Sequence, residues 1–358
     1  KININSLRIS GNAISLNCIS VRDYNFITIN YVEITNISSL FRTVNTNTTY
    51  IHVNEIHDTM TSTSTSRLFN ITYGNVYINI TSIYLNVSLE GINYIYIEPA
   101  NTANNNVSVY MNIDSLGRSE GGIFLSSIFN IVGSGSNAKN TVFYLNINKL
   151  SFTSITSTTA GISYIVKSSI SNSNTIQMLI NINHILVNLV DSDNTFTFFN
   201  LVGNNEVNIN SFVIKGTVPD NTICVSTNGV NTINVNYFNT SQLSVFYITA
   251  TGSITYLTVN NMNSSIFTVS AGISYININS MVLNISSTTS YFGITGGNSY
   301  LNIKSIISTS SQSITIFSIN SNSYINVDYI SVNSSADYFN ITGGTVTVNV
   351  KSIIYTVL

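Results

Sequence analysis

The chain of 358 residues is poor in charge, because 7% of its residues are charged while 44% are hydrophobic, against about a quarter charged in an average globular domain. The apolar residues suffice for a core, which excludes a disordered chain, and the surface is expected to consist of Asn, Ser and Thr. A net charge of −2 with 12 Lys and Arg excludes a phosphate-binding stripe for nucleic acid, and no apolar run is long enough for a membrane-spanning helix.

A repeat runs through the chain and is seen best when one residue is taken as position 0, as with Asn302 in YLNIKSI. The preceding residue is always Ile, Leu, Val or Met, the following one is Ile or Val, and position +4 is always apolar. This alternation of period two predicts a strand. The frame fits fourteen times, with position 0 at Asn3, Thr28, His52, Asn79, Asn112, Asn146, Asn181, Asn208, Asn234, Thr258, Asn277, Asn302, Asn326 and Asn349.

Each repeat is expected to form one coil of a solenoid, because a repeat length of about twenty to thirty residues is typical of that architecture. The first strand surrounds position 0, a short second strand starts near +4, and a polar linker leads to a third strand. In chain order, third strands are predicted at 68–72, 198–202, 245–249, 266–270 and 291–295. Gly or Asn follows them and is expected to turn the chain sharply with positive φ, at Gly74 and Asn75, Gly203 to Asn205, Gly296 and Gly297, and Gly343 and Gly344.

The longest coils lie between Asn79 and Asn181, where successive 0 positions are 33, 34 and 35 residues apart. Their extra residues predict outward loops at 101–106, 117–122, 133–140 and 153–161. Loops on a rigid scaffold are frequent binding sites, and the alternative is that these loops are tolerated polar insertions.

The repeated sequence pattern, with SYINI followed by ITGG, resembles that of the parallel β-helix family. It is also similar to the pattern of Asn/Ile-rich repeat proteins of large AT-rich viruses. The resemblance implies an all-β fold, a single-stranded parallel β-helix or β-solenoid, as one domain over residues 1–358 with about 14 coils of roughly 19–35 residues. The crossover rule favours a right-handed coil. Pectin-cleaving enzymes of this fold carry clustered Asp, Arg and Lys on one outer face, and this chain has no such cluster in its sequence.

Residues with catalytic or metal-binding chemistry are sparse, and we expect no catalytic site, no metal and no cofactor. The tightest acidic pair is Asp191 and Asp193, which fits a solvated turn better than a cation or acid–base site. Cys18 and Cys224 lie seven coils apart, too far for a disulfide. The histidines follow neither a metal-ligand spacing nor a cysteine pattern and are expected at the surface: His52, His57 and His184.

Position 0 and position +2 both face outward, so that one side of the rod is expected to carry two columns of amides. Such columns form hydrogen-bonded ladders in stacked sheets, and the face they create either stabilises the stack alone or recognises another copy, a glycan or ice. At position 0 the predicted ladder contains Asn79, Asn112, Asn146, Asn181, Asn208, Asn234, Asn277, Asn302 and Asn326. At +2 it contains Asn5, Asn30, Asn54, Asn148, Asn183, Asn210, Asn236, Asn260 and Asn279.

Eleven N-x-S/T sequons permit glycosylation without indicating it, because an Asn-, Ser- and Thr-rich composition produces about that number by chance. The candidate glycosylation sites are Asn36, Asn47, Asn70, Asn86, Asn284, Asn333 and Asn340.

The expected function is structural and non-enzymatic: a filament or fibre subunit, extracellular or on a cell or virion surface. Both ends of the chain fall inside a coil, which predicts head-to-tail stacking of copies, unless the chain is part of a longer solenoid that supplies caps. The expected partner is a second copy, with no nucleic acid and no membrane-spanning segment. The alternatives are an adhesin or glycan-binding stalk and a polysaccharide-active enzyme. The predicted assembly interface is Ile2, Ile4, Val348, Val350 and Ile353.

Overall fold

The computed structural model describes most of the chain, and within the described residues every regular element is a strand. The described residues are 1–10, 17–22, 25–35, 39–44, 47–59, 67–86, 89–90, 95–98, 106–118, 124–125, 127–133, 140–155, 164–170, 175–189, 197–216, 223–240, 245–248, 254–263, 266–284, 290–310 and 313–356.

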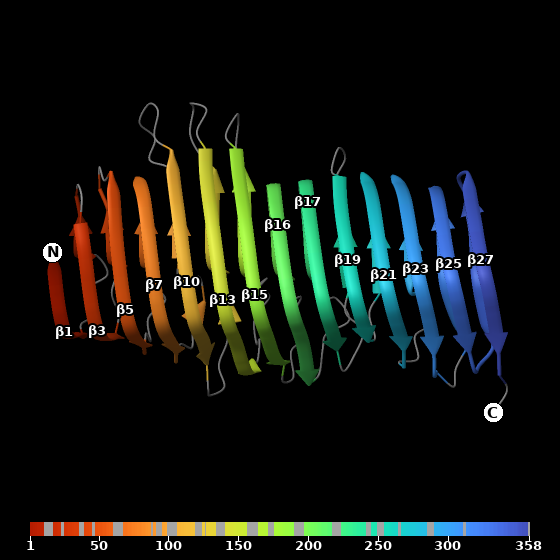
Figure 1. The fold of residues 1–358 in the computed structure, drawn as a ribbon, viewed down its shortest axis with the longest axis horizontal. Coiled ribbons are helices and arrows are strands. Elements are labelled where there is room, and N and C mark those ends of the chain that lie inside the picture. The colour runs from red at the N-terminus through yellow and green to blue at the C-terminus, as the bar shows by residue number, and fades with distance from the viewer. Residues whose placement is uncertain are drawn as a thin grey trace.

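One long strand per coil forms a parallel stack that runs the length of the rod, with the two ends of the chain at opposite ends (Figure 1). The stack consists of β1 (Ile2–Ser10), β3 (Asn25–Thr35), β5 (Thr48–Asp58), β7 (Gly74–Leu85), β10 (Val107–Arg118), β13 (Asn140–Ile155), β15 (Thr175–Leu189), β16 (Thr197–Gly216), β17 (Ile223–Thr240), β19 (Ile254–Asn263), β21 (Ile273–Leu283), β23 (Asn298–Ser308), β25 (Asn322–Val332) and β27 (Val346–Tyr355).

The register of this stack confirms the repeat frame. Each residue at position 0 pairs with the residue at position 0 of the next coil, from Asn3 with Thr28 through to Asn326 with Asn349. The apolar residues on either side therefore stack on equivalent residues, which keeps one continuous core. The fold is thus a parallel β-solenoid, as expected, while its right-handedness stays a prediction.

A second parallel stack closes each coil and corresponds to the predicted third strands. The first parts of β16 and β17 belong to it, because Phe199 pairs with Val166 on one side and Val225 on the other. Its other members are β2 (Asn17–Val21), β4 (Ser39–Thr43), β6 (Arg67–Ile71), β9 (Ile95–Ile97), β12 (Ser127–Gly133), β14 (Tyr164–Ile170), β18 (Val245–Ile248), β20 (Ile266–Val269), β22 (Phe292–Ile294), β24 (Ile314–Asn320) and β26 (Ala336–Gly343). A separate short pair is formed by β8 (Leu89–Glu90) and β11 (Phe124–Leu125).

The predicted second strand is not a separate element, because the long strand continues through a bend at position +2. In β23 the alternation of buried and exposed residues slips at this point: Lys304 and Ser305 both face outward before Ile306 turns inward again. Position +4 lies three residues after position +1, an odd offset that places the two on opposite faces of a straight strand, so both can face the core only if the strand bends between them. The paired register omits Lys304 and resumes at Ser305.

The corners between coils carry glycines in the left-handed region, as the sequence predicts. Gly74, Gly203, Gly297 and Gly344 have φ of 76°, 105°, 74° and 79°. At each double glycine it is the second residue that turns. A Cβ on Gly297 would lie 2.2 Å from the main-chain oxygen of Gly272 in the preceding coil, so both backbone conformation and close stacking require glycine there.

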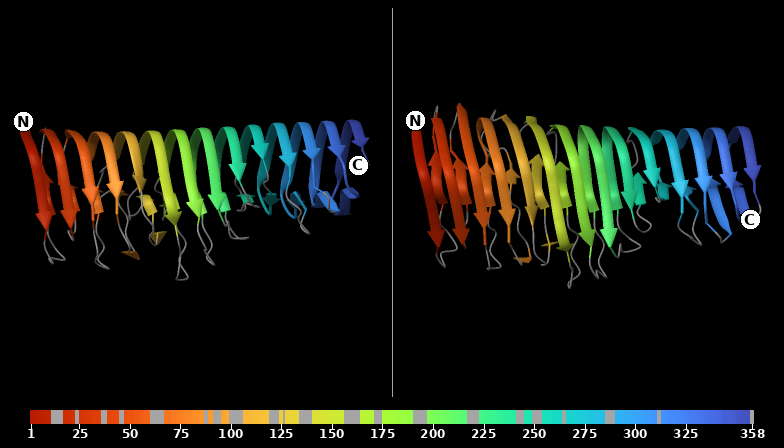
Figure 2. Two further views of the ribbon diagram at one scale, coloured as in Figure 1. Left: turned by 90° about the horizontal axis from the view of Figure 1, so that it is seen from below. Right: turned by 60° about the horizontal axis from the view of Figure 1, so that its bottom comes forward.

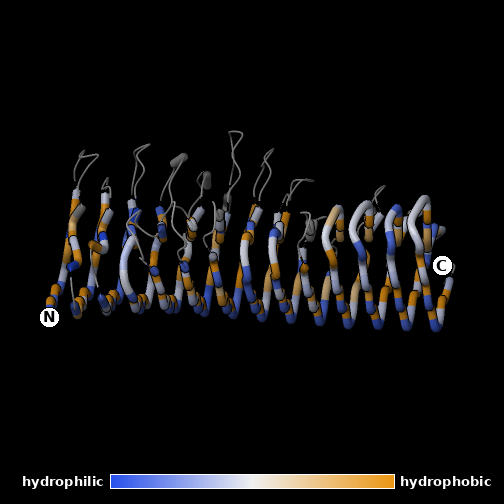
Figure 3. The backbone as a smooth tube through the Cα atoms, turned by 90° about the horizontal axis from the view of Figure 1, so that it is seen from above, coloured by the Kyte–Doolittle hydropathy of each residue, from blue (hydrophilic) through white to orange (hydrophobic). Residues whose placement is uncertain are grey.

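The core is a continuous apolar column of residues from both stacks, and Figure 2 shows how the ribbons of these stacks run along the rod. Figure 3 shows the cause, since hydrophobic and hydrophilic residues alternate along the tube of each coil. Phe292 of β22 is fully buried, and its ring stacks between those of Phe267 and Phe317 with centroids 5.0 and 4.8 Å away. Equivalent residues thus pack face to face along the rod, which adds aromatic stacking to apolar burial.

Candidate functional site

The side chains at position 0 form the predicted amide ladder on the outside of the long stack. In the first segment, from Asn79 to Asn234, each Nδ2 donates to the Oδ1 one coil earlier over 2.8–2.9 Å. Thr258 interrupts the column. A second segment joins Asn277, Asn302, Asn326 and Asn349 with bonds of 2.9–3.1 Å. The expectation of an Asn ladder is therefore confirmed.

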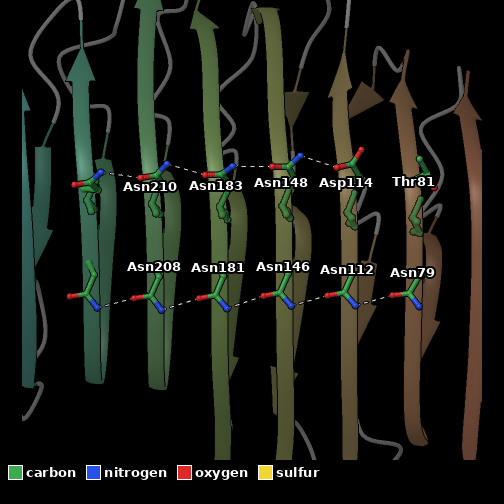
Figure 4. A pocket seen from close by; sticks show the side chains of 18 of the residues that line it. Asn79, Thr81, Asn112, Asp114, Asn146, Asn148, Asn181, Asn183, Asn208 and Asn210 are labelled. Atoms are coloured by element: carbon green, nitrogen blue, oxygen red, sulfur yellow. Dashed lines mark hydrogen bonds between the residues drawn. The ribbon is translucent and has the colours of Figure 1, made fainter.

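The side chains at position +2 form a second ladder parallel to the first (Figure 4). Asn54 donates to Asn30 over 3.1 Å, and Asn30 to Asn5 over 3.0 Å. After Thr81, a longer segment starts at the Asp114 carboxylate, which accepts from Asn148 over 2.8 Å. Bonds of 3.0 Å then join Asn148, Asn183, Asn210, Asn236 and Asn260.

Both ladders have one direction, because in each of these bonds the later coil donates and the earlier coil accepts. The amide dipoles therefore add, with their positive ends toward the N-terminal end of the rod. The charges on the +2 column complement this dipole as charges do at helix ends. Asp114 stands at the positive end of its segment, and beyond the last bonded amide, Asn260, the +2 column continues with Asn279 and then Lys304.

A groove runs between the two ladders along the rod. Its walls are the residues at 0 and +2, and its floor is the residue at +1, such as Ile113, Ile147 and Ile182. These isoleucines are each 2% exposed, so the floor consists largely of their main chain. The groove has a volume of about 790 Å³ from His52 to Asn260, and it continues from Thr258 to Lys351 with about 640 Å³.

An aromatic column that the sequence reasoning missed lies at position −2, beside the first ladder. The rings of Phe26, Tyr50, Tyr77, Tyr110 and Tyr144 stack with centroids 4.7–4.9 Å apart. Tyr256, Tyr275 and Tyr300 repeat the arrangement with 4.9 Å between rings. Stacking covers the ring faces, so the column presents ring edges and hydroxyl groups. Partial burial is the main cause that raises the pKa of the Tyr110 hydroxyl, and the neighbouring phenols of Tyr77 and Tyr144 raise it further.

Charged side chains on the described surface are few, and the ion pairs among them are isolated from one another. Lys351 bonds Asp328 at 2.7 Å across the +2 column, and Arg8 bonds Glu33 at 3.2 Å. Such exposed pairs contribute little to stability. No group of three or more His, Cys, Asp or Glu side chains in the described part of the chain is placed to hold a metal ion.

The candidate reactive residues that the structure describes are not brought together. His52 and His184 are exposed on different coils, and His57 lies beside Glu55 with Nε2 and Oε1 2.6 Å apart. Cys18 is half-buried and Cys224 is fully buried, and no disulfide joins them. Asp191 and Asp193 lie outside the described residues, as do most residues of the four predicted outward loops.

Among the candidate glycosylation sites, four are exposed in the described structure: Asn47, Asn86, Asn284 and Asn340. Asn70 and Asn333 are half-buried, and Asn36 lies outside the described residues.

The predicted assembly residues lie on the outermost coils of the rod. Ile2 and Ile353 are 43% and 46% exposed. Ile4 is half-buried, and it packs partly against the core together with Val348 and Val350.

Fold and surface together define the class of protein: a parallel β-solenoid with amide ladders on one face. Comparison with protein-family models, with curated proteins and with solved structures gives no match. The described residues include no helix of the length and hydrophobicity needed to cross a membrane.

Proposed function

We propose that the protein is a non-enzymatic structural subunit whose copies stack end to end into a filament. The observation that carries the proposal is the agreement between the outermost strands. When β27 of one copy is set against β1 of the next in the register of all other coils, Val348 meets Ile2, Asn349 meets Asn3, and Val350 meets Ile4. Apolar residues then cover apolar residues, and Asn3 can donate to the Oδ1 of Asn349 in the direction that both ladders follow.

The outer edges of these strands supply the main-chain groups for such a contact. Among the described residues, β1 pairs with β3 alone and β27 with β25 alone. Strand addition at such edges is a common mode of association. A contact between opposite ends of identical rods is heterologous and does not close, so it produces an open filament.

The proposed location is extracellular, on a cell or virion surface, and the proposed partner is a second copy. A surface of amides and hydroxyls with 7% charged residues supports this location, as does the resemblance to Asn/Ile-rich viral repeat proteins. The scattered charges support a role without catalysis, because acid–base chemistry needs carboxylates or other titratable groups held together.

The test uses two variants that each block one end of the rod. Val348→Lys places a charge in the contact at β27, and Ile2→Lys places one in the contact at β1. By sedimentation velocity the unchanged chain should form long assemblies, each variant alone should stay single, and an equimolar mixture of the two should form dimers through the unblocked ends.

A matched control is Ile307→Lys, because Ile307 faces outward from an internal coil, and this variant should assemble like the unchanged chain. The dimers also show that both blocked variants remain folded. The proposal is wrong if the unchanged chain stays monomeric at high concentration, or if the mixture gives no dimers, or if the blocked variants still form long assemblies.

A further inference from the structure

We propose that the groove between the two amide ladders binds a single chain of a neutral polysaccharide, laid along the rod axis. This inference goes beyond the proposed filament, since it concerns the side of the rod and not its ends. Four features of the groove support it: its shape, its repeat, its charge and its remaining hydrogen-bonding groups.

The shape of the groove admits one extended polymer. Its two walls are residues i and i+2 of the same strand, for example Asn181 and Asn183, with Ile182 as the floor between them. The same three positions recur on every coil, so the groove runs across many strands without a closed end (Figure 4).

The repeat of the groove favours a sugar chain over a polypeptide. Neighbouring coils present the same wall groups about every 4.8 Å, the spacing of paired strands. An extended polypeptide advances by about 3.3 Å per residue and falls out of step with the walls. One pyranose ring in an extended glycan spans a distance close to one coil, so each sugar meets the same set of amides.

The charge of the groove favours a neutral chain. From His52 to Asn260 the residues that line it are Asn, Thr, Ile and Val, with His52 and Asp114 as the ionisable exceptions. A polyanion would therefore meet no Lys or Arg among the described residues of this segment. The cations Lys304 and Lys351 line the second segment, where Lys351 is already paired with Asp328 at 2.7 Å.

The ladders leave hydrogen-bonding capacity for such a ligand. An Asn amide has two N–H donors and two acceptor sites on its oxygen, and the ladder uses one of each at Asn146, Asn181 and Asn183. One donor and one acceptor therefore remain at each of these three amides, which suits hydroxyl groups because they both donate and accept. Asn208 differs, because its Nδ2 also donates to Glu206 over 3.0 Å. The ladder bonds also hold the amides in place before binding, which lowers the ordering cost.

The neighbouring aromatic column is not expected to contribute. Its ring faces are covered by stacking at 4.7–4.9 Å, so a sugar cannot pack on them. The contact is therefore carried by the amides, and a tyrosine variant serves as the matched control.

Isothermal titration with cellohexaose, mannohexaose and xylohexaose tests the proposal, with cellobiose, mannobiose and xylobiose as the matching short ligands and hexagalacturonate as an anionic one. The test variant changes Asn181, Asn183, Asn208 and Asn210 to Thr, which stands at these columns naturally in Thr258 and Thr81. The control is Tyr110→Thr, since Thr232 occupies that column on another coil. Circular dichroism and Tm confirm that both variants retain the fold.

At least one neutral hexasaccharide should bind more tightly than its disaccharide, and the fourfold variant should bind it at least about tenfold more weakly, because several hydrogen bonds are lost. Tyr110→Thr should bind like the unchanged chain. The proposal is overturned if no neutral hexasaccharide binds, if hexagalacturonate binds as tightly, if affinity does not depend on length, or if the fourfold variant binds equally well.

Discussion

The direction of the amide ladder makes a prediction about two adjacent asparagines. Asn302 donates to Asn277 over 3.1 Å and accepts from Asn326 over 2.9 Å, whereas Asn277 takes part in its ladder as an acceptor. Asp can accept but, when ionised, cannot donate. Asn302→Asp should therefore lose one bond and set two acceptors against each other, while Asn277→Asp should keep the bond that it accepts.

The expected difference between the two variants is the net value of one exposed hydrogen bond, about 1 kcal/mol. Both sites are one coil or less from Lys304, so the new charge has a similar environment in each. Because a tenfold change corresponds to about 1.4 kcal/mol, amides of β23 and β25 should exchange hydrogen about fivefold faster in Asn302→Asp than in Asn277→Asp.

Hydrogen exchange read by mass spectrometry suits this comparison, because a solenoid is stabilised by contacts between neighbouring coils and responds locally. Peptides from β5 and β7 provide the internal control and should exchange alike in both variants. Equal exchange of β23 and β25, or faster exchange in Asn277→Asp, would refute the ladder direction.

Three further predictions concern corners, core and titration. Gly344→Ala should lower stability by about 1–3 kcal/mol, because φ is +79° and the added Cβ would lie 2.3 Å from a main-chain carbon, whereas Gly293→Ala, with its nearest contact at 3.8 Å, should be nearly neutral in denaturant unfolding. Phe292→Ala should cost about 3–5 kcal/mol by the same assay, and Tyr300→Ala, at a 41% exposed position, should cost much less. Burial raises the pKa of Tyr291 to about 12, and the pKa of Tyr96 is raised to the same value, so these two phenols should ionise after the exposed tyrosines in an ultraviolet titration. In the unfolded chain the Tyr291 phenol loses its proton at about pH 10. The stability that the buried, protonated phenol contributes is therefore present below that pH and is lost as the pH rises through the folded-state pKa. Ionisation of Tyr291 together with the exposed tyrosines would contradict the raised pKa.

The sequence permits prediction of the coil register because the need to bury the apolar residues constrains the register at every repeat. A shift of one residue would turn Leu301 and its equivalents on the other coils outward. The apolar pairs around position 0, such as those flanking Asn112 and Asn146, leave one frame that buries all of them. The glycine corners were predictable for a similar reason, since the positive φ of Gly297 and Gly344 admits few other residues.

The groove was not predictable in the same way. Its walls depend on the side-chain orientations that set the direction of the ladders. The aromatic column is visible in the sequence repeat, because an aromatic residue recurs at position −2, for example at Tyr77, Tyr110 and Tyr144. Reading that column in the same frame would have identified it.

Cryo-electron microscopy of the concentrated chain tests the proposed end-to-end stacking most directly. Fourteen coils at about 4.8 Å each give an axial repeat of about 67 Å in a continuous filament with no break between the coil of Asn349 and that of Asn3. End-to-end stacking should give unbranched rods many repeats long with this period. Separate rods of one repeat, or rods associated side by side, would contradict it.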